Sequence, residues 1–238
     1  MARRTTAQIL AQVQATIGYH SQWVEPVASL LITAASREIT EAYQWSYRKR
    51  VRLLQTVAPY SAGTVTATLG SSTLVGAGTV WTAAMVGAAL SVSGEPQYLF
   101  VAAVADATHL TLGDLEGNAT PWGQTTGALK TYSIFRVHYA LPADCDLVLF
   151  PTRDWPITEK TVEYFDQVDP YRTSRGTPQF FAMSQQAQVS GAESLNIEFW
   201  PIASAIYTMR MPYLRRAIDP LSPTDIPLCP TELVELLG

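Results

Sequence analysis

Apolar positions near the start of the chain repeat with helical spacing. Ile9, Val13 and Ile17 recur every four residues, which places them on one face of a helix. After a plausible stop at Gly18, the stretch Val24–Leu53 has no glycine, and its one proline lies in the first turn. We therefore expect two helices, the second long enough to need a partner surface along its length.

The pattern changes at Thr56, where Gly, Thr, Ser, Val and Ala become frequent and Lys and Arg become rare. The glycine-rich stretch Gly70–Gly87 is interpreted as turns around a buried Trp81, and Ser93–Gly94 as a short polar turn. Alternation and β-branched residues predict a small barrel or sandwich. Its expected strands are Gly63–Leu69, Ala89–Val92, Tyr98–Ala105, His109–Leu112 and Ala128–Phe135.

A third pattern begins at Arg136. Alternating residues predict strands at Leu195–Pro201 and Ala205–Pro212, which we expect to form one antiparallel pair. Five prolines from Pro212 to Pro230 then predict an extended arm, and Thr231 is placed to cap a final helix.

Together these patterns predict an α+β fold. Long N-terminal α-helices are expected to pack with a C-terminal region of mixed strands and arm, and a small β-barrel or β-sandwich module is inserted between them. The expected boundaries are 1–55 for the helical part, 56–135 for the β-module, and 136–238 for the strands, the arm and the start of the last helix.

The composition bears on the surface. Of the 238 residues, 47% are hydrophobic and only 15% are charged, against about 25% charged in a typical soluble domain. Either partners cover part of this surface, or the chain is a well-packed β-rich monomer. The net charge of −4 gives no overall basic excess for gripping nucleic acid.

The residues that would carry catalysis or bind metal are scattered. The three histidines, His20, His109 and His138, lie far apart in the sequence, and Asp144–Asp146 is interpreted as a turn after a proline. No P-loop, nucleophile elbow or HExxH pattern occurs. We therefore expect no enzyme activity, no cofactor and no metal site.

Cysteine use and hydropathy bear on the compartment. Cys145 and Cys229 do not make a disulfide framework and are expected to be reduced thiols in a cytoplasmic setting. The N-terminus lacks the apolar core of a signal peptide, and no apolar run has the length of a membrane span. No membrane partner is expected.

One dense basic cluster stands out, formed by Arg48, Lys49, Arg50 and Arg52. At the end of the predicted helix these cations would favour the helix dipole. The alternative is contact with DNA phosphates or with a neighbouring subunit, which the preceding Trp45 also suits because aromatic residues and arginine are enriched at interfaces.

The order of these parts resembles the head-to-tail adaptor (head completion, or connector) proteins of tailed bacteriophages. The resemblance covers nearly the whole chain, and its more specific part is the insert motif. It rests on four segments: GSSTLVGAGTVWTAAMVG with its following strands, HYALPADCDLVLF, LNIEFWPIASAIYTMRMPYLRRAIDPL and DIPLCPTEL.

This resemblance implies a structural virion protein at the head-to-tail junction, assembled in the host cytoplasm. About twelve copies would form a ring that joins the portal to the tail tube, nozzle or other tail proteins and extends the channel for double-stranded DNA. It makes Trp81, Met85 and Trp122 candidates for a tail-facing surface. The candidate portal-binding residues lie in the arm and are Leu221, Ile226, Leu228, Leu233 and Leu236.

Other functions stay open at this point. A stopper, tail-tube or tail-terminator protein would form rings without the portal. A receptor-binding or carbohydrate-binding virion component would present exposed aromatic side chains in a shallow groove, and Trp122 beside Gly123 is the residue to check. A virion-associated hydrolase is the third class, and it would depend on Asp144 and Asp146.

Overall fold

The fold is mainly β rather than the predicted α+β. The computed structural model describes residues 5–17, 24–42, 45–95, 97–124, 126–187 and 193–216. Within these ranges it has sixteen strands and three α-helices. The prediction of long N-terminal helices is therefore wrong, and strands carry most of the architecture.

Contacts divide the chain into two compact units. The first consists of the described residues within Met1–Arg52, Asp144–Leu149 and Pro212–Gly238, and the second of those within Leu53–Ala143 and Phe150–Met211. Each unit is thus assembled from segments that are distant in the sequence.

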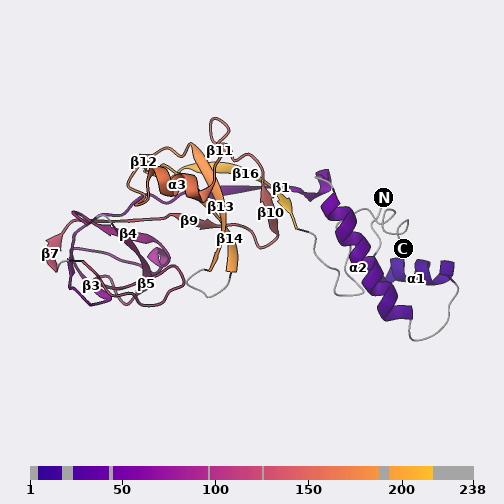
Figure 1. Ribbon diagram of the computed structural model, residues 1–238, viewed down its shortest axis with the longest axis horizontal. Coiled ribbons are helices and arrows are strands. Elements are labelled where there is room, and N and C mark those ends of the chain that lie inside the picture. The colour runs from indigo at the N-terminus through magenta and orange to yellow at the C-terminus, as the bar shows by residue number, and fades with distance from the viewer. Residues whose placement is uncertain are drawn as a thin grey trace. The chain divides into compact units, whose positions relative to one another are not determined.

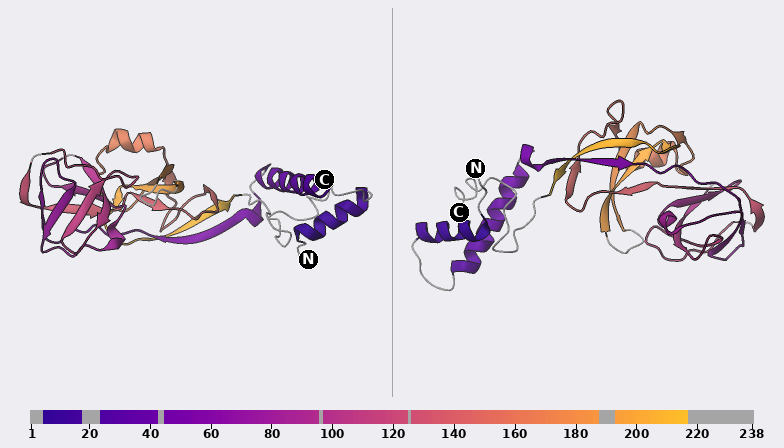
Figure 2. Two further views of the ribbon diagram at one scale, coloured as in Figure 1. Left: turned by 90° about the horizontal axis from the view of Figure 1, so that it is seen from below. Right: turned by 180° about the vertical axis from the view of Figure 1, so that it is seen from behind.

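Two helices make up the N-terminal part of the first unit. Helix α1 (Thr6–Ile17) packs beside α2 (Val24–Ala42), as Figures 1 and 2 show. Their contact is made by Ile9, Ala35 and Ile39, all buried. Ile9 therefore lies on the face of α1 that meets α2.

The expected long helix ends eleven residues early. Helix α2 stops at Ala42, and a 3-10 turn η1 (Ser46–Arg48) leads into strand β1 (Lys49–Gln55). Arg, Leu and Gln are good helix formers, but pairing of this segment with strand β16 overrides that local preference. Charged and apolar residues alternate from Arg50 to Leu53, which is the spacing of a strand.

Strand β1 belongs to a three-stranded sheet with the order β1-β16-β10. The partners are β16 (Thr208–Arg215) and β10 (Cys145–Val148), which run antiparallel to each other. Because β16 lies in the middle, β1 has one free edge within this sheet.

Seven strands form a second sheet, ordered β7-β2-β3-β6-β5-β4-β8. Thr131 alone separates the two edge strands in sequence, so the sheet curls until its edges approach one another (Figure 1). Strand β3 was not predicted because glycines obscured its alternation. The bounds are β2 Thr64–Ala67, β3 Thr73–Ala77, β4 Ala89–Val92, β5 Tyr98–Val104, β6 His109–Gly113, β7 Gly127–Lys130 and β8 Tyr132–Phe135.

The remaining strands form a four-stranded sheet, ordered β11-β13-β14-β9, and a short parallel pair. A seven-residue helix, α3 (Val162–Val168), is capped by the Thr161 hydroxyl, which accepts a hydrogen bond from the Tyr164 amide. The bounds are β9 His138–Ala140, β11 Thr158–Glu159, β13 Phe180–Ala187 and β14 Glu193–Trp200, with β12 Arg175–Gly176 and β15 Ile202–Ala203 in the pair.

The predicted pairing of the two late strands is also wrong. Strand β14 pairs with β13 in an antiparallel register of eight residue pairs and with β9 on its other side, whereas β16 pairs in the other sheet. Both edges of β14 are therefore occupied, and β16 finds its partners in β1 and β10.

Candidate functional site

The predicted basic cluster lies on η1 and β1, not at the C-terminus of a helix. The helix-dipole interpretation of these cations therefore does not apply. Lys49, Arg50 and Arg52 are exposed, whereas Arg48 is only 3% exposed. The four residues thus fall into one anchor and three surface cations.

Arg48 joins three segments of the first unit. Its Nη1 donates to the Thr40 carbonyl at 2.8 Å, and its Nε donates to the Arg215 carbonyl at 2.9 Å. Its Nη2 forms an ion pair with Asp146 at 2.5 Å. Arg48 therefore fixes the end of α2 to β16 and β10, and it is not available to DNA or a partner.

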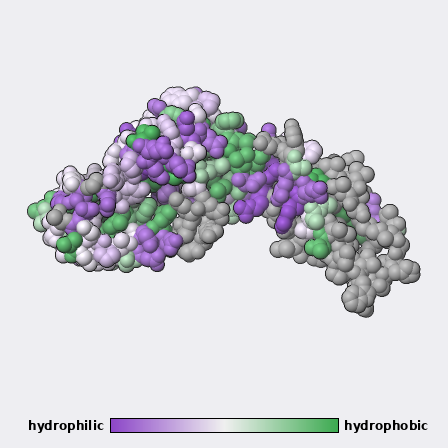
Figure 3. Space-filling model, in the orientation of Figure 1, coloured by the Kyte–Doolittle hydropathy of each residue, from purple (hydrophilic) through white to green (hydrophobic). Residues whose placement is uncertain are grey.

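The three surface cations have few protein partners. The Arg50 guanidinium donates to the Lys49 and Tyr47 carbonyls, and no carboxylate in the described part of the chain pairs with Lys49, Arg50 or Arg52. Alternation along the strand puts Arg50 and Arg52 on one face and Lys49 on the other. Figure 3 shows hydrophilic residues gathered where β1 begins.

Strand β1 also exposes apolar side chains. All five residues from Lys49 to Leu53 are exposed, and among them Val51 is 50% and Leu53 66% exposed. Among the residues that the structure describes, this strand presents both faces and an unpaired edge, which natural proteins usually cover or protect.

The candidate tail-facing residues lie in a core instead of on a surface. Trp81 and Trp122 are 3% and 2% exposed, and Met85 packs against the same cluster. The indole nitrogen of Trp81 donates to the Tyr132 hydroxyl at 3.0 Å, and that hydroxyl donates to the Ala62 carbonyl at 2.7 Å. Burial raises the pKa of Tyr132 to about 12. Trp122 accordingly does not supply the exposed aromatic surface that a carbohydrate-binding component needs.

The candidate portal-binding residues, from Leu221 to Leu236, lie outside the described residues.

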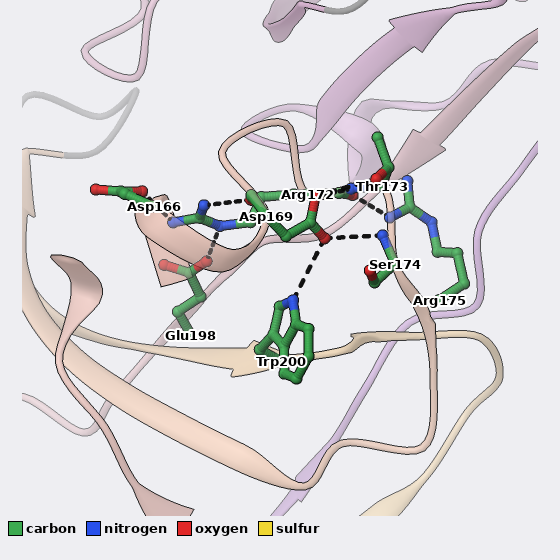
Figure 4. Close-up of polar contacts among 8 residues, drawn as sticks. All are labelled: Asp166, Asp169, Arg172, Thr173, Ser174, Arg175, Glu198 and Trp200. Atoms are coloured by element: carbon green, nitrogen blue, oxygen red, sulfur yellow. Dashed lines mark hydrogen bonds and ion pairs between the residues drawn. The ribbon is translucent and has the colours of Figure 1, made fainter. Parts of the chain in front are cut away.

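A loop cluster of polar contacts follows α3, and the sequence did not predict it. It consists of Asp166, Asp169, Arg172, Thr173, Ser174, Arg175, Glu198 and Trp200 (Figure 4). The Asp169 carboxylate accepts hydrogen bonds from the Thr173 and Ser174 amides, both at 2.8 Å, and from the Trp200 indole at 3.3 Å. These bonds hold the pKa of Asp169 below its usual value despite desolvation, which acts in the opposite direction. The loop between α3 and β12 is thereby fixed to β14.

Arg172 is the central cation of this loop cluster. It has a positive φ of 51°, its Nε pairs with Glu198 at 2.5 Å, and its Nη2 pairs with Asp166 at 2.6 Å (Figure 4). The side chains of Arg172 and Glu198 are 3% and 1% exposed. A buried ion pair with this many bonds is costly to break, because either partner alone would be an uncompensated buried charge.

His138 lies directly opposite Glu198 in the pairing of β9 with β14. Burial is the largest cause that lowers its pKa, to about 4, and the positive charges of Arg172 and Arg136 act in the same direction. His138 is therefore neutral at pH 7 and becomes a buried cation only in acid.

The sequence carried only a partial signal for the loop cluster. Asp166 and Asp169 end an acidic tract that begins at Asp154 and is typical of a solvated face, but their partners Arg172 and Trp200 lie 6 and 31 residues away. Glu198 and Trp200 are two residues apart and lie on one face of β14, but no spacing links them to Arg172, which the loop after α3 brings to them.

The carboxylates considered for metal binding or hydrolysis are engaged by arginines. Asp146 pairs with Arg48, and Asp144 accepts a bond from Arg215 Nε at 2.8 Å. Among the residues that the structure describes, no group of three or more potential ligands gathers to hold a metal ion.

Cys145 stands between these two aspartates in the sequence, and its thiol is buried. Desolvation is the main cause that raises the pKa of this thiol to about 12. A thiol with such a raised pKa is not an activated nucleophile.

In the described part of the chain, no helix combines the length and apolar character that crossing a membrane requires.

Comparisons with protein-family models, with curated proteins and with solved structures find no match for this chain.

Proposed function

We propose that this chain is a structural virion protein, an adaptor ring subunit that joins a portal to a tail and extends the DNA channel. The observation that supports the proposal is strand β1, with its run of exposed residues and its free sheet edge. A neighbouring subunit would cover Val51, and the cations of the strand would contact a neighbour or DNA phosphates.

The hydrogen bonds of Arg48 also support the proposed function. The three segments that it binds hold the start of β1 in place, and this keeps the surface cations in a fixed arrangement before any partner arrives. A preorganised strand loses less conformational entropy on association than a free segment does.

Native mass spectrometry of the full chain, alone and with the portal ring of its own virus, tests the proposal. The expected result is a free chain that adds to the portal in a fixed copy number. No association with the portal would contradict it. Rings that form without the portal would indicate a stopper, tail-tube or tail-terminator protein instead.

A matched pair of variants tests the role of β1. Val51→Glu should abolish addition to the ring, whereas Val75→Glu on β3, also a strand valine and 44% exposed, should leave it unchanged. Ring addition by Val51→Glu at the wild-type level would contradict the proposed interface. Deletion of Leu221–Gly238 tests the expected portal-docking arm in the same assay.

A further inference from the structure

The polar turn at Ser93–Gly94 borders a cavity of the second unit with a volume of about 300 Å³. Its walls come from the end of β4 and the turn after it, from the start of β8, and from the loop between α3 and β12. Gly94 has a φ of 87°, which glycine adopts without strain, so the turn depends on this residue. The cavity volume is at the lower end of the range for small-molecule sites.

Most of the residues that line this cavity carry a hydroxyl group. Ser91, Ser93, Thr131 and Ser133 all contribute, and none of their hydroxyls has a hydrogen-bond partner within the described residues. Each hydroxyl can both donate and accept a hydrogen bond. The walls therefore offer several unused polar groups to a ligand that itself carries hydroxyls.

Arg175 supplies a positive charge to the same cavity. The Cζ atom of its guanidinium lies 3.9 Å from the centroid of the Phe135 ring, and its Nη1 donates to the Arg172 carbonyl (Figure 4). No carboxylate in the described part of the chain forms an ion pair with it. The remaining N–H groups of the Arg175 guanidinium are suited to binding a planar carboxylate.

The one acidic residue that lines the cavity does not cancel this charge. Glu95 is paired with Lys130 at 3.0 Å, and its side chain is only 11% exposed. Burial also lowers the pKa of Arg175, which means that its charge is poorly solvated in the protein alone. A bound anion would compensate for that lost hydration.

We propose that this cavity binds a small carboxylate that carries several hydroxyl groups, of the sugar-acid class. The carboxylate would pair with Arg175, and the ligand hydroxyls would bond to the serine and threonine side chains. Tyr171, which is 43% exposed at the rim, offers an aromatic face against which a sugar ring can pack. This site is independent of the proposed ring function, and its test needs no portal.

Titration of the full-length ¹⁵N-labelled chain with D-glucuronate, D-glucose and sulfate, followed by NMR chemical shifts, tests the assignment. Glucuronate should shift amide signals around Ser93 and Thr131, and it should bind at least about tenfold more tightly than glucose, since only glucuronate carries the carboxylate that the fork recognises. Sulfate should bind more weakly than glucuronate because it lacks the sugar hydroxyls.

Arg175→Gln should reduce glucuronate affinity about tenfold. The control is Arg153→Gln, because the Arg153 guanidinium also lies over an aromatic ring, that of Tyr207 at 4.5 Å, but does not line the cavity. If Arg175→Gln fails to fold, Tyr171→Ala at the rim provides a second test and should also weaken binding.

Three outcomes of the titration would overturn the assignment. They are the absence of any shift with glucuronate, equal affinity for glucose and glucuronate, and sulfate binding as tight as that of glucuronate. Unchanged binding by both Arg175→Gln and Tyr171→Ala would place the ligand elsewhere and would also overturn it.

Discussion

Arg172 and Arg50 carry the same guanidinium group in opposite surroundings. Arg172 is 3% exposed and is bound by two carboxylates and a carbonyl of the loop after α3. Arg50 is exposed on β1, and within the described residues its side chain donates only to neighbouring carbonyls of its own segment. In this protein, therefore, an arginine that is bonded to carboxylates stabilises the fold, whereas an exposed arginine without such bonds is available to bind a partner.

Replacing Arg172 is the change with the largest expected effect. Arg172→Met should lower the free energy of unfolding by about 3–5 kcal/mol because Glu198 is left as an unpaired buried charge. Urea denaturation measures the change. Arg50→Met is the matched control and should shift stability by no more than about 0.5 kcal/mol. Similar losses in both variants would remove the distinction between the two arginines.

The loop cluster also predicts a pH dependence of stability through His138. Its pKa of about 4 lies below the ordinary value of 6.5, so the unfolded chain binds more protons between these two values. The contribution of His138 is therefore complete above pH 6.5 and is lost as the pH falls toward 4, by about 3 kcal/mol. In His138→Phe the slope of unfolding free energy against pH should be smaller across this window, and identical slopes would refute the assignment.

Tyr132 is buried, polar and uncharged. Replacing it should therefore lower the free energy of unfolding by less than replacing the charged Arg172 does. Tyr132→Phe removes the acceptor of the Trp81 indole and the donor to Ala62, which should cost about 1–3 kcal/mol. Thermal or urea unfolding measures this loss. Tyr171→Phe at an exposed position is the control, and we expect it to be nearly neutral.

The exposed cations should have the smallest effect on stability and a clear effect on DNA binding. Arg50→Gln with Arg52→Gln should leave unfolding within about 0.5 kcal/mol of wild type and should lower the salt dependence of double-stranded DNA binding by about two phosphate contacts. Arg153→Gln with Arg210→Gln removes the same charge from the second unit. An equal change in that control would indicate a general charge effect.

The pattern of apolar and polar residues predicted several strands correctly. It failed where pairing with a distant strand determines the secondary structure. The expected strands at Ala89–Val92 and His109–Leu112 are present as β4 and β6, and in β6 the buried Leu110 and Leu112 alternate with less buried polar residues. The residues from Lys49 to Leu53 were expected to be helical because their propensities are compatible with a helix, but they belong to β1, which pairs with β16. Buried Trp81 was anticipated as core, whereas Trp122 offered no local sign of its burial.

Sequence alone was enough to identify the β-rich segment after Thr56, to place Trp81 in a glycine-rich core segment, and to locate the one dense group of cations. These properties depend on neighbours a few residues away, so they follow from spacing and composition. Tertiary packing, by contrast, makes Arg48 an anchor, brings Arg172 to Glu198, and places Arg175 in one cavity with the Ser93 turn. Those contacts join residues 26 to 167 positions apart, and sheet register and loop packing bring them together.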